Sequence, residues 1–347
     1  MSISAAHNLD GKVLAGGWTV LGKLPKAASS GGTFSVGYIV KGPKQEDGFL
    51  KALDIAAAMG SGDMVSALRE MTAAFEFERD LVEKCRLNRM KKVVLPFTSG
   101  QVAVDQTPLG MVPYIIFEKA TNSVRGLLDD FNDFELAWIF RSLHNTAVGM
   151  MELHGNKITH QDLKPSNVLV FEDDIEDICK IGDLGRASDA NKKGPFDIQV
   201  AGDQRYVPFD LFYQMGDLSD FDRKRSTDLY LLGSMIFNLF CGSPITFAIA
   251  AKVERKNITN VFAESLPFIE QAFSDVMNDF EAVLLKKAGK LSSEVLELVK
   301  KLCDPDPRQR GEKNLIGTSI SQYNLQRCVS KLDLLSGKAE FELKRVL

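Results

Sequence analysis

The sequence predicts an α+β fold with two lobes: a small β-rich first lobe with one main helix, and a larger α-helical second lobe. Two observations predict it. Short apolar runs separated by turn residues fill the first third of the chain, and apolar residues at helical spacing prevail from Phe134 onward. With 347 residues, of which 45% are hydrophobic, the chain is long enough to give each lobe its own core.

In the first third, five apolar runs predict strands, at residues 33–40, 49–53, 93–97, 101–104 and 114–117. Residues 61–90 predict a helix, and its apolar stripe contains one charged residue, Glu78. Lys51 is likewise charged within an apolar strand. Because each charge would be costly alone in apolar surroundings, we expect Lys51 and Glu78 to form a pair, with Glu76 as the alternative partner.

Composition limits the classes of protein to which this chain can belong. Its net charge of −4 does not indicate a nucleic-acid partner. The five cysteines are far apart, without metal-ligand spacing, and are predicted to be reduced core thiols. The longest apolar run, residues 229–241, is shorter than the ~20 residues of a membrane span, and no secretion signal is visible. We therefore expect a cytoplasmic chain with no membrane association.

The most informative stretch is residues 158–171, in which Asp162, Lys164 and Asn167 precede an apolar run typical of a short strand. A second acid, Asp183, follows in Ile-Gly-Asp-Leu-Gly. A carboxylate can orient a hydroxyl and accept its proton, and a lysine can neutralise a phosphoryl group. Carboxylate and amide oxygens suit Mg²⁺. These residue types indicate phosphoryl transfer from a metal nucleotide.

This stretch resembles the catalytic loop of eukaryotic-like serine/threonine protein kinases, His-Arg-Asp-Leu-Lys-Pro-x-Asn. The resemblance implies ATP and Mg²⁺ as cofactors, with Mn²⁺ as an alternative. It implies that Asp162 is the catalytic base, that Lys164 acts on the transferred phosphoryl group, and that Asn167 and Asp183 bind metal. It also implies that Lys51 holds the ATP phosphates and that Glu78 is its partner.

Other nucleotide contacts follow from the same resemblance. Ser30-Gly31-Gly32-Thr33-Phe34 is similar to the glycine-rich loop of the family, which implies that Gly31, Gly32 and Phe34 cover the phosphates. Glu118 and Ala120 fall where the family binds adenine through main-chain groups, after a gatekeeper at Phe117. Leu169 falls where the family has the apolar floor under the purine. Phe49 replaces a small alanine above it.

Three distant motifs extend the resemblance to most of the chain. Asp228 falls at the start of a helix where the family has an aspartate that caps the backbone near the catalytic loop. Asp210 replaces the glutamate of Ala-Pro-Glu, and Arg310 or Arg308 is expected to pair with it. The predicted domains are 1–118 for the first lobe, 119–311 for the second lobe and 312–347 for a helical C-terminal extension.

Two departures from the family bear on regulation. Gln161 replaces the arginine that receives a phosphate from the activation loop in related kinases. Between Asp183 and Asp210, only Ser188 and Tyr206 carry hydroxyl groups. We therefore expect no control by activation-loop phosphorylation. Asp203 replaces a threonine that contacts the catalytic base, which implies altered substrate placement.

Lys164 favours serine or threonine over tyrosine as the acceptor in a protein substrate. Two alternatives stay open. The first is a small-molecule phosphotransferase of the aminoglycoside type, which shares the spacing of the two aspartates and the asparagine. The second is a pseudokinase scaffold that binds nucleotide without transfer. The sequence does not indicate an oligomeric state.

Overall fold

The computed structural model describes residues 4–25, 34–60, 63–105, 110–130, 134–172, 177–192, 194, 202–213 and 218–346. Contacts divide the chain into two compact units. Unit 1 comprises Met1–Ser123 and Leu169–Gly185, and unit 2 comprises Val124–Val168 and Arg186–Leu347. The α+β class, with strands early and helices late, is confirmed. Residues 169–185 group with unit 1, whereas the domain bounds predicted from the sequence include them in 119–311.

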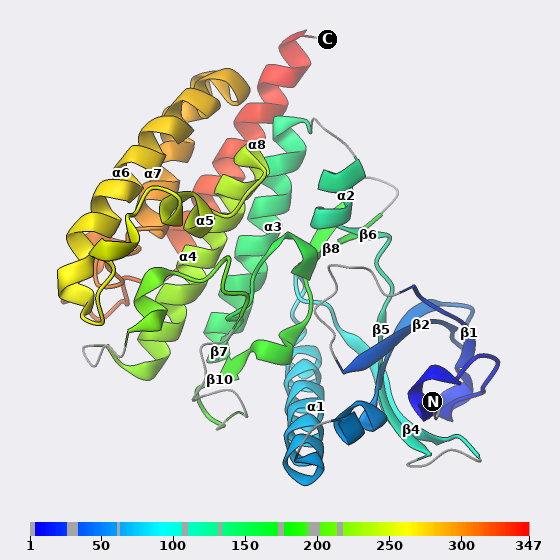
Figure 1. Ribbon diagram of the computed structural model, residues 1–347. Helices are drawn as coiled ribbons and strands as arrows, with labels where there is room; N and C mark the ends of the chain where they lie inside the picture. The colour runs from blue at the N-terminus through cyan, green and yellow to red at the C-terminus, as the bar shows by residue number, and fades with distance from the viewer. Residues whose placement is uncertain are drawn as a thin grey trace. The chain divides into compact units, whose positions relative to one another are not determined.

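Unit 1 contains an antiparallel sheet in the order β1-β2-β3-β5-β4, together with one long helix, α1 (Figure 1). The elements of unit 1 are β1 (Thr19–Lys23), β2 (Ser35–Lys41), β3 (Asp47–Leu53), α1 (Met64–Leu87), β4 (Pro96–Ala103), β5 (Met111–Glu118), β6 (Asn122–Ser123), β8 (Val168–Phe171, whose first residue belongs to unit 2) and β9 (Ile178–Ile181). The helix α1 begins where the side chain of Asp63 accepts a hydrogen bond from Ser66 N. This is an ordinary N-cap.

One face of the sheet is covered by the chain's own N-terminal segment, residues 4–18, which the sequence analysis did not predict. Leu9 and Trp18 of this segment are buried with Tyr38 of β2 and Tyr114 of β5 in one apolar cluster. The Tyr38 hydroxyl donates to Ala6 O at 2.8 Å. The segment therefore completes the core on the face of the sheet opposite Lys51, because side chains alternate between faces along a strand.

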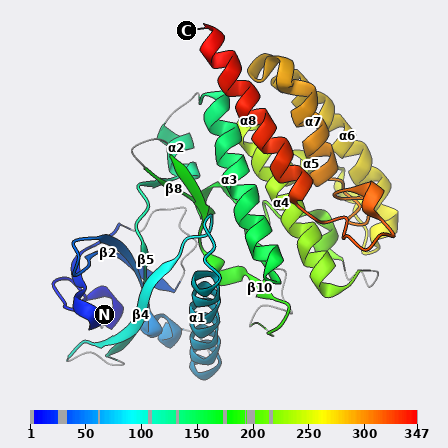
Figure 2. The same cartoon turned by 180° about the vertical axis from the view of Figure 1, so that it is seen from behind.

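Unit 2 is mainly helical, and in both views α8 runs beside α3 (Figures 1 and 2). Its elements are α2 (Val124–Asp130), α3 (Leu136–Gly155), β7 (Ile158–Thr159), β10 (Ser188–Asp189), α4 (Asp220–Cys241), α5 (Ile245–Ala250), α6 (Phe262–Lys287), α7 (Ser292–Leu302) and α8 (Gln326–Val346). The helix α4 begins at the N-cap Ser219 and ends at Gly242 in a left-handed conformation.

The helix α8 packs against α3 through one apolar side, with Leu332 and Leu335 fully buried. Among the described residues, no helix has both the length and the apolar character of a membrane span.

All five cysteines are free thiols. Burial raises the pKa of the Cys328 thiol to about 12, which keeps it protonated.

Candidate active site

In unit 1 the structure brings together Lys51, Glu78 and Asp183. The Lys51 ammonium donates to both carboxylate oxygens of Glu78, at 2.7 and 2.9 Å, and lies 3.3 Å from Asp183 Oδ1. Lys51 reaches this position from the middle of β3, and Glu78 from the buried stripe of α1. Asp183 follows β9 with a positive φ of 54°, a conformation that is uncommon for a residue other than glycine. The charged residues that interrupt two apolar patterns therefore meet, as the sequence predicts.

The electrostatics of this cluster keep the lysine charged. Burial alone would lower the pKa of Lys51, but the carboxylates of Glu78 and Asp183 overcome this effect and raise it. Burial raises the pKa of Glu78, and the Lys51 ammonium opposes that rise. Asp183 is the most exposed member, with 41% of its side chain accessible. The cluster thus holds an ammonium beside an accessible carboxylate.

The residues predicted to meet a purine also belong to unit 1. Leu169 of β8 is half-buried, and a Cβ added to Gly182, the residue before Asp183, would lie 3.2 Å from its Cδ1. Phe49 lies on the same face of β3 as Lys51, and its ring rests on Gly37, where a Cβ would come within 2.9 Å of it. This close approach explains a glycine in the middle of β2. Ala120 is half-buried after the end of β5.

Glu118 has a structural role that the sequence analysis missed. Its carboxylate accepts from Leu95 N at 2.9 Å and from the Lys180 ammonium at 2.5 Å. The side chain therefore ties the end of β5 to β9, three residues before Asp183. No local pattern signals this pair, because its members are 62 residues apart.

The predicted glycine-rich loop is only partly described. Gly31 and Gly32 lie outside the described residues. Phe34 is described and is 49% exposed, and its carbonyl accepts from Asp54 N at 2.9 Å.

In unit 2 the Asp162 carboxylate is held by three donors. Asp203 N donates to Oδ1 at 2.9 Å, and the Lys164 ammonium and Asn167 Nδ2 lie 2.9 and 3.2 Å from Oδ2. Asn167 Nδ2 also donates to the Asp162 carbonyl at 2.8 Å, which closes the loop on itself. The Asp162 side chain is only 10% exposed, and these donors orient its carboxylate. A buried carboxylate oriented in this way can accept a proton from a hydroxyl placed against it.

The Asp228 side chain of α4 holds the backbone of the loop that carries Asp162, as the sequence predicts. Its fully buried carboxylate accepts from His160 N at 2.9 Å and Gln161 N at 2.8 Å. The side chains of Gln161 and His154 also donate to it, at 3.0 and 2.8 Å. Gln161 has a positive φ of 65°, and its amide donates to Lys224 O as well. The side chain of Gln161 is therefore engaged inside unit 2.

A buried ion pair holds the segment that contains Asp210. The Arg310 guanidinium is fully buried and donates to Asp210 Oδ1, while Arg308 pairs with Asp306 instead. The structure thus selects Arg310 from the two arginines that the sequence left open.

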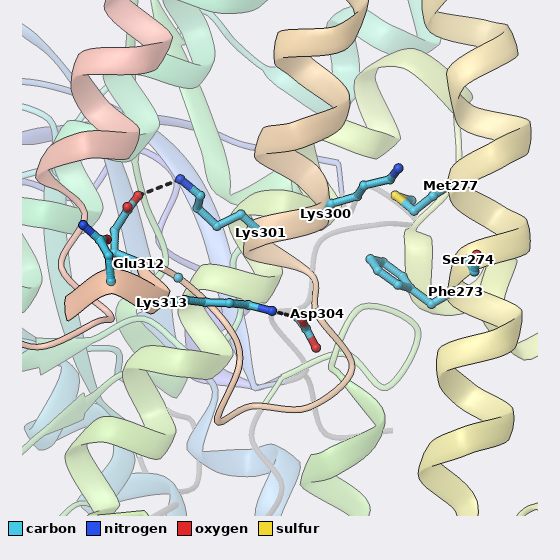
Figure 3. A pocket seen from close by; sticks show the side chains of 10 residues that line it. Phe273, Ser274, Met277, Lys300, Lys301, Asp304, Glu312 and Lys313 are labelled. Atoms are coloured by element: carbon cyan, nitrogen blue, oxygen red, sulfur yellow. Dashed lines mark hydrogen bonds and ion pairs between the residues drawn. The ribbon is translucent and has the colours of Figure 1, made fainter. Parts of the chain in front are cut away.

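Unit 2 also has a groove that is lined by none of the predicted site residues. It is lined by Phe273 and Met277 of α6, by α7 and by the segment that follows it (Figure 3). Lys301 is paired with Glu312 at 3.0 Å, and Lys313 with Asp304 at 3.1 Å. None of the predicted site residues lines this groove, and two of its lysines serve these ion pairs.

The sequence profile described as "Protein kinase domain" matches residues 111–316, more than half of the chain. The chain belongs to the protein kinase domain family. The match includes Asp162, Lys164, Asn167 and Asp183. It begins at β5, so Lys51 and Glu78 precede it.

Several proteins named as kinases are similar to parts of the chain. The Wee1-like protein kinase of Arabidopsis thaliana is 25% identical over 168 residues, which are 48% of this chain and 26% of that protein. A probable serine/threonine-protein kinase of Dictyostelium discoideum is 23% identical over 56% of this chain and 38% of its own length. Cyclin-dependent kinase 9 of Danio rerio is 30% identical over 36% of this chain and 31% of its own length. The chain therefore spans well under half of these kinases.

Membership of the kinase family implies ATP and Mg²⁺, and the donor groups fit them. In unit 1, Asp183 offers an accessible carboxylate beside the charged Lys51. In unit 2, Asn167 Nδ2 donates a hydrogen bond to the Asp162 carbonyl. The Asn167 Oδ1, on the other side of the amide, lies 3.4 Å from Ser166 Oγ. Both are hard oxygen donors of the kind that Mg²⁺ prefers. The described residues contain no cluster of three or more His, Cys, Asp or Glu that would form a separate metal site.

Proposed function

We propose that this protein transfers the γ-phosphoryl group of ATP to serine or threonine hydroxyls of a protein substrate. The observation that carries the proposal is the Asp162 carboxylate, which is nearly buried and held by Lys164, Asn167 and the Asp203 amide. Asp162 orients the attacking hydroxyl and accepts its proton. Lys164 stabilises the negative charge of the phosphoryl group during transfer.

The nucleotide is bound by residues of unit 1. Lys51 contacts the α- and β-phosphates, and Glu78 keeps the lysine charged and oriented. Asp183 of unit 1 would bind the main Mg²⁺, and Asn167 of unit 2 would bind a second Mg²⁺, with Mn²⁺ as an alternative. When bound, the metal neutralises phosphate oxygens and so favours displacement at the γ-phosphorus.

The remaining contacts follow the family pattern. Gly31, Gly32 and Phe34 cover the phosphates, Glu118 and Ala120 meet the adenine through main-chain groups, and Leu169 supports the ring. Phe49 narrows the space above the adenine.

Activity is independent of activation-loop phosphorylation. In related kinases, an arginine before the catalytic aspartate pairs with the phosphate. Here Gln161 stands in that place, and its amide donates to Asp228 and to Lys224 O. A neutral side chain engaged in this way offers no charge to a phosphate.

The decisive experiment compares the wild type with Asp162→Asn and Lys51→Ala. Each protein is incubated with labelled ATP, Mg²⁺ and a general protein substrate, and Asp279→Asn serves as a control at a 71% exposed carboxylate. We expect label on serine or threonine, and a loss of about 10²- to 10⁴-fold in Asp162→Asn.

Two other outcomes would reject the proposal. Thermal stabilisation by Mg-ATP without transfer would indicate a scaffold that only binds nucleotide. Transfer only to a small hydroxylated compound would indicate a small-molecule phosphotransferase.

A further inference from the structure

The segment Gly202–Tyr206 lies directly against the catalytic loop. A Cβ on Gly202 would come within 2.5 Å of Gln161 O, so the two backbones leave no room for a side chain. The next residue, Asp203, donates its amide hydrogen to Asp162 Oδ1. The exposed side chains of this segment therefore lie close to Asp162, the proposed catalytic base.

The segment presents an arginine that is held in one orientation. Arg205 Nε and Nη2 donate to the two carboxylate oxygens of Asp203, at 3.0 and 2.7 Å, and Arg205 N donates to Oδ1 at 3.0 Å. These bonds, together with the charge of Arg205, lower the pKa of Asp203, so the pair is fully charged at neutral pH. A guanidinium fixed by a fork of this kind loses little further freedom on binding.

The arginine is nevertheless open to solvent. Its side chain is 75% exposed, while that of Asp203 is only 19% exposed. Within the described part of the chain, Arg205 donates only to Asp203, and its Nη1 makes no hydrogen bond. Neutralising Asp203 requires only the Nε and Nη2 groups of Arg205. It does not account for the exposure of Nη1 to solvent.

Other cations also act electrostatically on this segment. The positive charge of Lys164 acts on Asp203, and those of Arg125 and Arg205 both act on the hydroxyl of Tyr206. Arg125 is itself paired with Asp129 at 3.1 Å on the exposed side of α2. A negatively charged group that approaches Asp162 along this segment therefore meets Arg205 as its most exposed cation.

We propose that Arg205 is a specificity-determining residue that binds the carboxylate of an aspartate or glutamate next to the serine or threonine acceptor. The inference rests on the proposed function and names the substrate class for the same site. The fork of a guanidinium matches a carboxylate, so the outer Nη1 edge can donate to a second carboxylate while the Nε and Nη2 groups donate to Asp203.

The test uses peptides with one central serine in a neutral background, each carrying either a single aspartate or a single lysine at one flanking position. The values of kcat/KM are compared for wild type, Arg205→Ala and Arg205→Glu. Arg255→Glu makes the same charge change at an exposed arginine of η7 (Arg255–Asn257) and serves as the control. Wild type and control should prefer an aspartate beside the serine by about 3- to 5-fold, which is typical of a solvent-exposed charge pair. The preference should vanish in Arg205→Ala and shift to lysine-containing peptides in Arg205→Glu.

A second measurement separates this inference from the activity itself. Fluorescein-labelled peptides in which alanine replaces the serine are titrated by anisotropy, at low and at high salt. We expect the aspartate peptide to bind more tightly, with the difference reduced by salt. Equal binding of aspartate and neutral peptides, or an acidic preference unchanged in Arg205→Glu, would overturn the role of Arg205. Phosphorylation of neutral peptides alone would support the kinase activity and reject the acidic specificity.

Discussion

The Lys51 ammonium and the Glu78 carboxylate form a two-pronged contact of 2.7 and 2.9 Å within unit 1. Each residue is charged at an apolar position of its own element, and each removes the cost of burying the other. The pair leaves the ammonium 3.3 Å from Asp183, so its charge also faces the proposed metal ligand.

Glu78→Gln should therefore reduce kcat/KM by about 10²-fold, because the lysine loses its fixed orientation toward the phosphates. Glu76→Gln is the matched control, since it makes the same change on the exposed side of α1. Steady-state kinetics at several ATP concentrations measure the effect. Equal losses in the two variants would show that the pair has no special role.

Activity should survive removal of phosphate. Ser188 is buried and accepts a hydrogen bond from Lys224 at 2.8 Å, and Gln161 offers no charge to a phosphate. We expect phosphatase-treated wild type and Ser188→Ala to keep full kcat, with intact mass used to verify the absence of phosphate. A phosphate on Ser188 that activity requires would contradict this.

The buried pair of Arg310 and Asp210 should dominate the stability of unit 2. The two side chains are 0% and 3% exposed, so Arg310→Ala leaves a buried carboxylate without its partner. We expect a loss of about 3–5 kcal/mol in the free energy of unfolding in urea. Arg308→Ala removes an arginine that is 45% exposed, and should cost about 1 kcal/mol or less. Similar losses in the free energy of unfolding for Arg310→Ala and Arg308→Ala would mean that burial of the ion pair does not determine its contribution to stability.

The sequence predicts those features whose signal is local. Lys51 and Glu78 were found because a charge interrupts an apolar period, and Asp162 and Asn167 because their spacing is short and specific. Asp228 was found through the resemblance of its motif to the kinase family. The assignment of roles to these residues is still a prediction.

Features that depend on distant partners could not be predicted. The sequence predicts two separate runs here, 93–97 and 101–104. In the structure β4 continues through Gly100, where an added Cβ would come within 2.7 Å of the Tyr114 hydroxyl. The N-terminal segment has no period of its own, and Leu9 is buried only because the sheet lies against it. No sequence pattern marks Arg205 as a candidate site residue, because its fixed orientation depends on the contact with Asp203.

Attachment of α8 should depend on pH through Glu294 of α7. Lys331 and Lys338 of α8 donate to its carboxylate at 2.6 and 2.8 Å, and these bonds lower its pKa below the usual 4.5. A lowered folded-state pKa stabilises the protein above pH 4.5, and this contribution is lost as the pH falls through the folded-state value.

Glu294→Gln should therefore reduce stability by about 0.5–1 kcal/mol at pH 7 and by much less at acid pH. Glu297→Gln, on the exposed side of the same helix, is the control. Urea unfolding at each pH measures the difference. A loss that does not change with pH would refute an ionic origin.

Gly202→Ala should separate stability from activity. Gly202 has a φ of 89°, and an added Cβ would meet Gln161 O at 2.5 Å, so the segment that carries Asp203 must move away from Asp162. Gly242→Ala is the matched control, because Gly242 has a similar φ of 75° and nothing within 4 Å of the added Cβ. Both variants should lose about 1–2 kcal/mol through backbone strain. Only Gly202→Ala should also lower kcat, by about 10²-fold, because the proposed base loses the amide that orients it. Thermal unfolding and single-turnover transfer measure the two effects, and an undiminished kcat in Gly202→Ala would show that the Asp203 amide does not orient Asp162.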